Sequence, residues 1–175
     1  MRMPLLPGLS RFAGRRAVLP AEAAQALGVQ DERVLAWSSL PGDGVAAATV
    51  QGLRVLTPMG KLIRRPWVDV SHVAWDEDSR TLAVWWVGSR QPLPVELPEH
   101  TFLPEVVHER VRSSVLLSRD VPVPGRTPVW VALRQDADGA FSTQAVAPPG
   151  VRLDEPEVAA AVAAAQQALR SEAGA

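Results

Sequence analysis

The sequence has no cysteine and no tyrosine, and Lys61 is the only lysine among its 18 basic residues. The absence of cysteine excludes both a disulfide framework and a thiolate metal site. It also agrees with a reducing compartment, so we expect a cytoplasmic protein. The excess of arginine and the lack of tyrosine indicate a codon bias of the source rather than a functional requirement.

Long apolar runs are also absent. No stretch approaches the ~20 apolar residues of a membrane span, and Pro4 and Pro7 interrupt the first apolar segment, so we predict no secretory signal. The formal net charge is −1, without the broad basic face of a nucleic-acid binder. A membrane-spanning protein and a nucleic-acid-binding protein are therefore excluded as function classes.

The chain is organised around residues 61–88, which read as two strands, an acidic turn and a further strand. The period-2 pattern of a half-buried strand appears at residues 68–75. It places Val68, Val70, His72 and Ala74 on one face, and Asp69, Ser71, Val73 and Trp75 on the other. Residues 76–79 (DEDS) are polar turn formers. The segment at 81–87 (TLAVWWV) is apolar on both faces, which predicts a covered central strand.

The remaining pattern predicts an α+β protein. Residues 1–19 form an irregular arm, and PAEAAQALG predicts a short helix that stops at Gly28. Further strands are expected at 33–37, 45–50, 53–57, 62–66 and 93–97. An amphipathic helix follows at 103–117. A hairpin (128–133 and 140–146, around Asp138-Gly139) and a helix with a capping box from Asp154 to Glu157 complete the chain.

Seven short strands followed by one amphipathic helix, at residues 31–117, resemble a bacterial pleckstrin-homology-like (PH-like) domain. The local motifs that carry the resemblance are the strand Leu53–Thr57, the Pro66-Trp67-Val68-Asp69-Val70 step and the strand end Val73–Trp75. The resemblance covers about half of the chain. It implies an antiparallel barrel, or two packed sheets, closed by the helix. Residues 1–30 are then an arm with a short helix, and 118–175 a hairpin-plus-helix extension packed on the barrel as one compact unit.

Two departures from the family bear on function. The first hairpin loop, residues 38–44, has no cation where phosphoinositide-binding members place lysine and arginine, and the closing helix lacks tryptophan. Head-group binding is therefore not implied for this chain. The resemblance instead implies a fold used for contact with other proteins, often with a second copy.

The candidate interaction surface combines a basic patch with an aromatic pair. Arg54, Lys61, Arg64 and Arg65 form the basic patch, which could meet an acidic partner or a lipid surface. The alternative interpretation, which we favour, is an edge strand guarded by charge. Trp85 and Trp86 are adjacent on one strand and face opposite sides, so one leaves the interior and is covered by the extension or by a partner.

A second candidate surface is the arm, where Arg11, Phe12, Arg15 and Arg16 form a candidate membrane contact. Without a lipid anchor such a segment would bind an anionic membrane only weakly.

The sequence offers no assembled catalytic or metal-binding set, and we predict no cofactor. Asp69 and His72 are three apart on a strand, so they face opposite sides, and the acidic residues at 76–78 read as a solvated turn. His108 lies near Glu105 but no nucleophile accompanies it. A small enzyme is therefore the least favoured function. The leading expectation is a non-catalytic interaction or scaffold module that binds an unidentified protein or itself, and the alternative is a membrane-surface adaptor using the arm and the basic patch.

Overall fold

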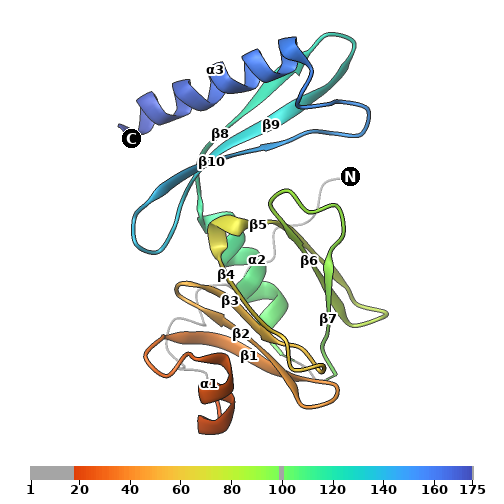
Figure 1. Ribbon diagram of the computed structural model, residues 1–175, viewed down its shortest axis with the longest axis vertical. Helices are drawn as coiled ribbons and strands as arrows, with labels where there is room; N and C mark the ends of the chain where they lie inside the picture. Colours follow the sequence, from red (N-terminus) through yellow and green to blue (C-terminus); the bar gives the residue numbers. More distant parts are fainter. Residues whose placement is uncertain (1–17, 99–100, 175) are drawn as a thin grey trace, which may run out of the picture.

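The computed structural model describes residues 18–98 and 101–174, which fold into three antiparallel sheets and three α-helices. The protein is of the α+β class, as the sequence predicts. Figure 1 shows the elements in tiers along the long axis: the third sheet and α3 lie at one end, α2 and the second sheet in the middle, and the first sheet with α1 at the other end. Among the described helices, none is long and apolar enough to cross a membrane.

The first sheet is a meander of four strands, in the order β1-β2-β3-β4. Their bounds are β1 (Val34–Leu40), β2 (Gly44–Thr49), β3 (Gly52–Leu56) and β4 (Leu62–Pro66). Gly42 and Asp43 both have positive φ, as a tight reversal between β1 and β2 requires. At Gly52 an added Cβ would overlap the backbone of Arg65 and Pro66, so only glycine allows β3 and β4 to pair this closely.

The second sheet contains β5 (Val70–Asp76), β6 (Thr81–Trp86) and β7 (Leu93–Glu96), with β6 in the centre as expected. The predicted face pattern of β5 is wrong at its start. Residues Trp67–Asp69 form a 3-10 turn, η2, and the register shifts between Val70 and His72. Because of this bulge, Val70 and Val73 pack on the core whereas His72 is exposed.

These two sheets enclose one hydrophobic core together with α2 (Leu103–Ser113). The seven predicted strands and the helix are present. Of the two predicted arrangements, the closed barrel is wrong, because the strands form two separate sheets that share this core. Leu53 and Val55 of the first sheet, Leu82 and Val84 of the second and Val107 of α2 are almost completely buried. The helix therefore packs on the same core as both sheets.

The helix α2 ends at Ser113, earlier than the predicted 103–117, and residues Val115–Leu117 already belong to the next strand. This strand, β8 (Val115–Val123), pairs with β9 (Arg126–Gln135), which pairs with β10 (Phe141–Val146). The extension is thus a three-stranded sheet rather than the predicted hairpin. Apolar residues recur in VVHERVRSSVLL at helical spacing, which is why the sequence alone extends the helix.

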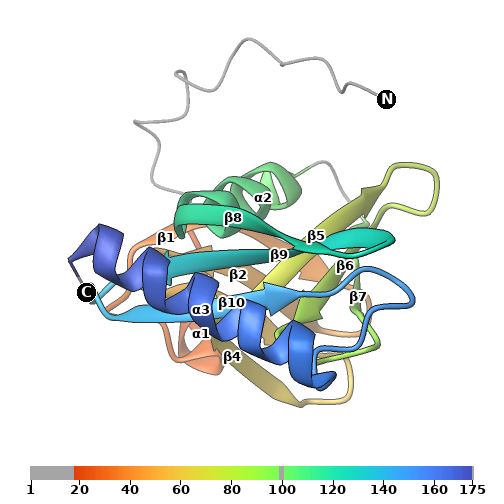
Figure 2. The ribbon, with the colours of Figure 1, turned by 90° about the horizontal axis from the view of Figure 1, so that it is seen from above.

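The third sheet has its own core beneath α3 (Pro156–Ala173). Val129, Val131 and Leu133 of β9 are fully buried against this helix, which crosses the sheet obliquely in Figure 2. The predicted capping box is wrong. The N-cap is Glu155 without a side-chain bond, and the Asp154 carboxylate accepts bonds from Arg152 instead.

The helix α1 (Ala21–Leu27) ends at Gly28, as predicted, because Gly28 adopts the left-handed conformation with φ 64°. It packs on the outer face of the first sheet through a small third cluster that includes Leu27, Val29 and Ala47. The first sheet is therefore covered on both faces, by α1 outside and by the common core inside.

Candidate functional site

The predicted basic patch lies along β4 and is divided between two faces of the sheet. Arg64 and Arg65 are consecutive on an extended strand, so their side chains leave opposite faces. Lys61 lies just before β4, where its backbone closes the turn to Thr57, and its side chain is exposed. β4 is an edge strand of its sheet.

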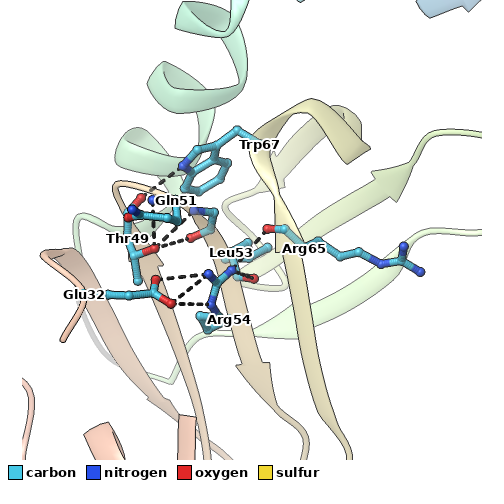
Figure 3. Close-up of polar contacts among 8 residues, drawn as sticks. Glu32, Thr49, Gln51, Leu53, Arg54, Arg65 and Trp67 are labelled. Atoms are coloured by element: carbon cyan, nitrogen blue, oxygen red, sulfur yellow. Dashed lines mark hydrogen bonds and ion pairs between the residues drawn. The ribbon is translucent and has the colours of Figure 1, made fainter. Parts of the chain in front are cut away.

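Arg54 lies on the neighbouring strand β3, but it is only 9% exposed. Its guanidinium binds both carboxylate oxygens of Glu32, with Nη2 to Oε1 and Oε2 distances of 2.9 and 3.1 Å (Figure 3). Arg54 Nη1 also donates to the carbonyls of Leu53 and Arg65. Because its donors are occupied, Arg54 stabilises the sheet. The exposed positive charge of the patch therefore comes from Lys61, Arg64 and Arg65.

A second polar network fixes the turn between β2 and β3. The Thr49 hydroxyl accepts the backbone N–H groups of Gln51 and Gly52 and donates to the Gly52 carbonyl. The indole N–H of Trp67 donates to the Thr49 carbonyl over 3.0 Å, as Figure 3 shows. Trp67 is 2% exposed, so this bond satisfies its buried donor and ties η2 to the first sheet.

Arg64 and Arg65 have different surroundings. Arg64 pairs across the strands with Arg54, and its guanidinium lies against Gly28 at the carboxyl end of α1. A helix carboxyl end favours a cation, and Arg64 has no carboxylate partner among the described residues. Arg65 pairs loosely with Asp69 at 3.4 Å and lies over the Trp86 ring at 5.7 Å.

These arginines line a cleft of about 240 Å³ at the junction of the first and third sheets. One wall consists of Gln51, Arg54, Arg64, Arg65 and Pro66, and the other of Asp136, Ala137 and Asp138 from the β9–β10 turn. The cleft therefore presents positive charge on one wall and negative charge on the other. The carboxylate of Asp136 already holds its own turn through the N–H groups of Asp138 and Ala140.

Arg134 of β9 fixes the junction beside this cleft, and it is 1% exposed. Its guanidinium donates to six acceptors: the carbonyls of Trp67, Val68, Val70 and Val111, the Ser114 hydroxyl and the Gln144 side-chain oxygen. The carbonyls come from η2, the start of β5 and the end of α2. Arg134 thus bridges the third sheet to the first core, and its rigid set of donors suits such convergent oxygens.

Burial lowers the pKa of Arg134 to about 10, opposed by the negative charge of Asp69. The group therefore stays protonated near pH 7. Sequence reasoning missed this residue because an arginine near the end of an apolar strand normally reaches solvent. No local signal indicates its burial, since the groups that bury it come from residues 67–70 and 111–114.

The two adjacent tryptophans do face opposite sides. Trp86 packs against the first core, whereas Trp85 lies on the outer face of the second sheet. There Trp85 stacks on His72, with ring centroids 4.3 Å apart and 11° between the planes. Burial lowers the pKa of His72 from 6.5. The outward tryptophan is therefore covered in part by a histidine of the neighbouring strand.

The other sequence candidates are not assembled into a site. Arg11, Phe12, Arg15 and Arg16 lie outside the described residues. Within residues 18–98 and 101–174, no three acidic, histidine or cysteine side chains are grouped so that they could hold a metal ion. A wider, shallow depression near the β8–β9 turn is lined by Arg126, whose guanidinium is engaged by Glu155 at 2.9 Å.

Comparison with known proteins gives no family for this chain: no family model, curated protein or solved structure matches it.

Proposed function

We propose that this chain is a non-catalytic protein-interaction module built on a PH-like domain at residues 31–117. Two features support the PH-like assignment: a meander of four strands followed by one of three, and a helix, α2, that packs on the core they share. The motifs around Trp67 also support it, since this tryptophan anchors η2 to the first sheet.

The cleft at the junction of the first and third sheets carries the proposal. Its 240 Å³ is below the ~300 Å³ at which small-molecule pockets usually begin. It is therefore suited to one or two side chains of a protein segment. Arg64 contributes positive charge to one wall, and no carboxylate among the described residues pairs with it.

The charges of the cleft indicate the partner. An acidic side chain entering it would meet Arg64, and guanidinium–carboxylate pairs are strong when bidentate. Asp138 on the opposite wall would favour a basic or polar neighbour in the same segment. We therefore expect a partner segment that carries an aspartate or glutamate next to a residue of opposite charge.

A second candidate function is an anionic-lipid adaptor. It is favoured by the β3–β4 turn, where Met59 is 93% exposed beside the exposed Lys61. An apolar side chain next to a cation suits the interface of an anionic membrane. The acidic wall formed by Asp136 and Asp138 would repel such a surface, so we rank this function second.

Peptide display tests the protein-binding function. The wild-type protein is panned against a random peptide library, and the affinity of each enriched peptide is then measured for Arg64→Glu and for the control Arg90→Glu. Arg90 is exposed in the β6–β7 loop, away from the cleft lining. We expect acidic peptides, with binding weakened about tenfold or more by Arg64→Glu because repulsion replaces attraction, and unchanged by Arg90→Glu.

Two results would contradict this function: enrichment of no peptide, or binding that is insensitive to Arg64. Sedimentation with phosphatidylserine vesicles tests the lipid function separately. Vesicle binding that is lost on Lys61→Glu would favour the lipid adaptor.

A further inference from the structure

The edge strand β10 (FSTQAV) has neither charge nor proline, a property that it shares only with β1 among the edge strands of the described residues. Edge strands are normally guarded by such residues. The guards on the other edges are Arg64 and Arg65 on β4, Asp76 on β5, Pro94 on β7, and Arg119 and Asp120 on β8. β1 is also uncharged, but Thr101 crosses its edge and donates its hydroxyl to the Trp37 carbonyl.

The turn between β9 and β10 determines which residues of β10 direct their backbone N–H and C=O groups towards β9 and which direct them towards the open edge. Asp136 N–H donates to the Ala140 carbonyl, so these opposite residues form a hydrogen-bonded pair. Such pairs alternate along an antiparallel ladder. Ser142 and Gln144 therefore bond to β9, whereas the backbone groups of residues 141, 143 and 145 point away from β9 towards the open edge.

The side chains of the residues whose backbone groups point to the open edge are uncharged. Phe141 is 39% exposed, and Thr143 and Ala145 on the same face are partly exposed. Phe141, Thr143 and Ala145 share the face that carries α3, since they are paired with Gln135, Leu133 and Val131 of β9. No further strand pairs with β10 among the described residues.

We propose that two copies of this chain associate by antiparallel pairing of their β10 strands about a two-fold axis at Thr143. This inference goes beyond the cleft function and does not depend on it. In that register Thr143 lies opposite the second copy's Thr143, and Phe141 opposite its Ala145. The backbone groups of all three residues point outward, so each of these pairs between the two copies is hydrogen-bonded. The two three-stranded sheets then join into one sheet of six strands.

The self-complementary register favours a second copy over a different strand. A two-fold axis places the same face of both sheets on the same side, so both α3 helices lie above the joined sheet and the assembly closes at two chains. The outward positions of α3 include exposed alanines at 159, 160, 163 and 164, so a second helix can approach without burying a charge there.

Charge exchange at the axis tests this arrangement. We would measure the solution mass of the full chain by light scattering for the wild type, for Thr143→Lys and Thr143→Glu alone, and for their equimolar mixture. The wild type should have twice the 18.8 kDa of one chain. Each variant alone should dissociate about tenfold or more readily because like charges meet at the axis. The mixture should recover the dimer.

Ser118→Lys is the matched control, since Ser118 is exposed on β8, the opposite edge of the same sheet, and should leave the dimer intact. Amide hydrogen exchange provides a readout without substitution: the N–H groups of residues 141, 143 and 145 should be protected at high protein concentration and exchange quickly at low concentration. A monomeric wild type, a dimer that persists in Thr143→Lys, or amides whose exchange does not depend on concentration would overturn the proposal.

Discussion

Replacing Arg134 by methionine should uncouple the third sheet from the first two. Methionine approximates the length of the arginine stem but cannot donate a hydrogen bond. The substitution leaves the buried carbonyls of Trp67, Val70 and Val111 and the side chain of Gln144 without their donor. The core shared by the first two sheets and the core of the third sheet are separate clusters, so Arg134 is a principal polar connection between them.

The size of the effect follows from the acceptors that lose their donor. An unsatisfied buried polar group costs about 1–3 kcal/mol, so the four acceptors named above would together give about 4 kcal/mol at the lower limit. Removing Arg134 also removes the desolvation penalty of a cation with no carboxylate partner among the described residues, which offsets part of this cost. We expect a net loss of about 3 kcal/mol, a large fraction of the stability of an ordinary domain.

Urea denaturation measures this loss with two probes. Five of the six tryptophans precede residue 115, so fluorescence reports mainly on the first two sheets, whereas circular dichroism includes α3. The wild type should give coincident transitions. Arg134→Met should give a lower midpoint and two separate transitions. Arg134→Lys should lose nearly as much, because one ammonium has three donors and cannot reach both η2 and the end of α2.

The control is Arg119→Met, which alters an exposed arginine of the same sheet paired with Glu172 at 3.2 Å. An exposed pair of this kind contributes about 0–1 kcal/mol. If Arg134→Met unfolds within about 0.5 kcal/mol of wild type in one coincident transition, Arg134 does not couple the two cores.

Two further predictions concern the first and second sheets. Gly52→Ala should destabilise the protein by about 3 kcal/mol in urea denaturation, because its Cβ would overlap the backbone of the paired strand. The control Gly60→Ala should cost only about 1 kcal/mol, since Gly60 has φ 77° but open space around it; equal losses would contradict the steric argument. In an NMR titration the pKa of His72 should be lower than 6.5 and should rise in Trp85→Ala, which exposes the ring. Because the unfolded chain binds this proton more readily, the His72 contribution to stability should fall as the pH drops through 6.5; a pKa at or above 6.5 would exclude this.

Local sequence signals predicted the elements that depend on neighbouring residues. Gly28 ends α1 and the acidic stretch after Asp76 reverses the chain between β5 and β6, because backbone conformation and solvation there are decided within a few residues. The alternating and apolar segments likewise predicted all seven strands of the first two sheets.

The errors arose where distant residues decide the outcome. The end of α2 and the start of β8 have similar apolar spacing, and only pairing with β9 makes residues 115–123 a strand. The bulge that exposes His72 depends on η2, which the indole of Trp67 anchors to Thr49. The arginines of the predicted patch have different roles because Glu32, far away in sequence, neutralises Arg54 alone.

The sequence by itself determined the α+β class, the turns and most strand positions, since these follow from periodicity and from residues with restricted backbone conformations. Only the tertiary structure decided that the strands form separate sheets, that Arg134 is buried at their junction, and that Arg64 and Asp138 face one cleft. The physical reason is that burial and charge pairing depend on the convergence of segments many residues apart, which no local pattern contains.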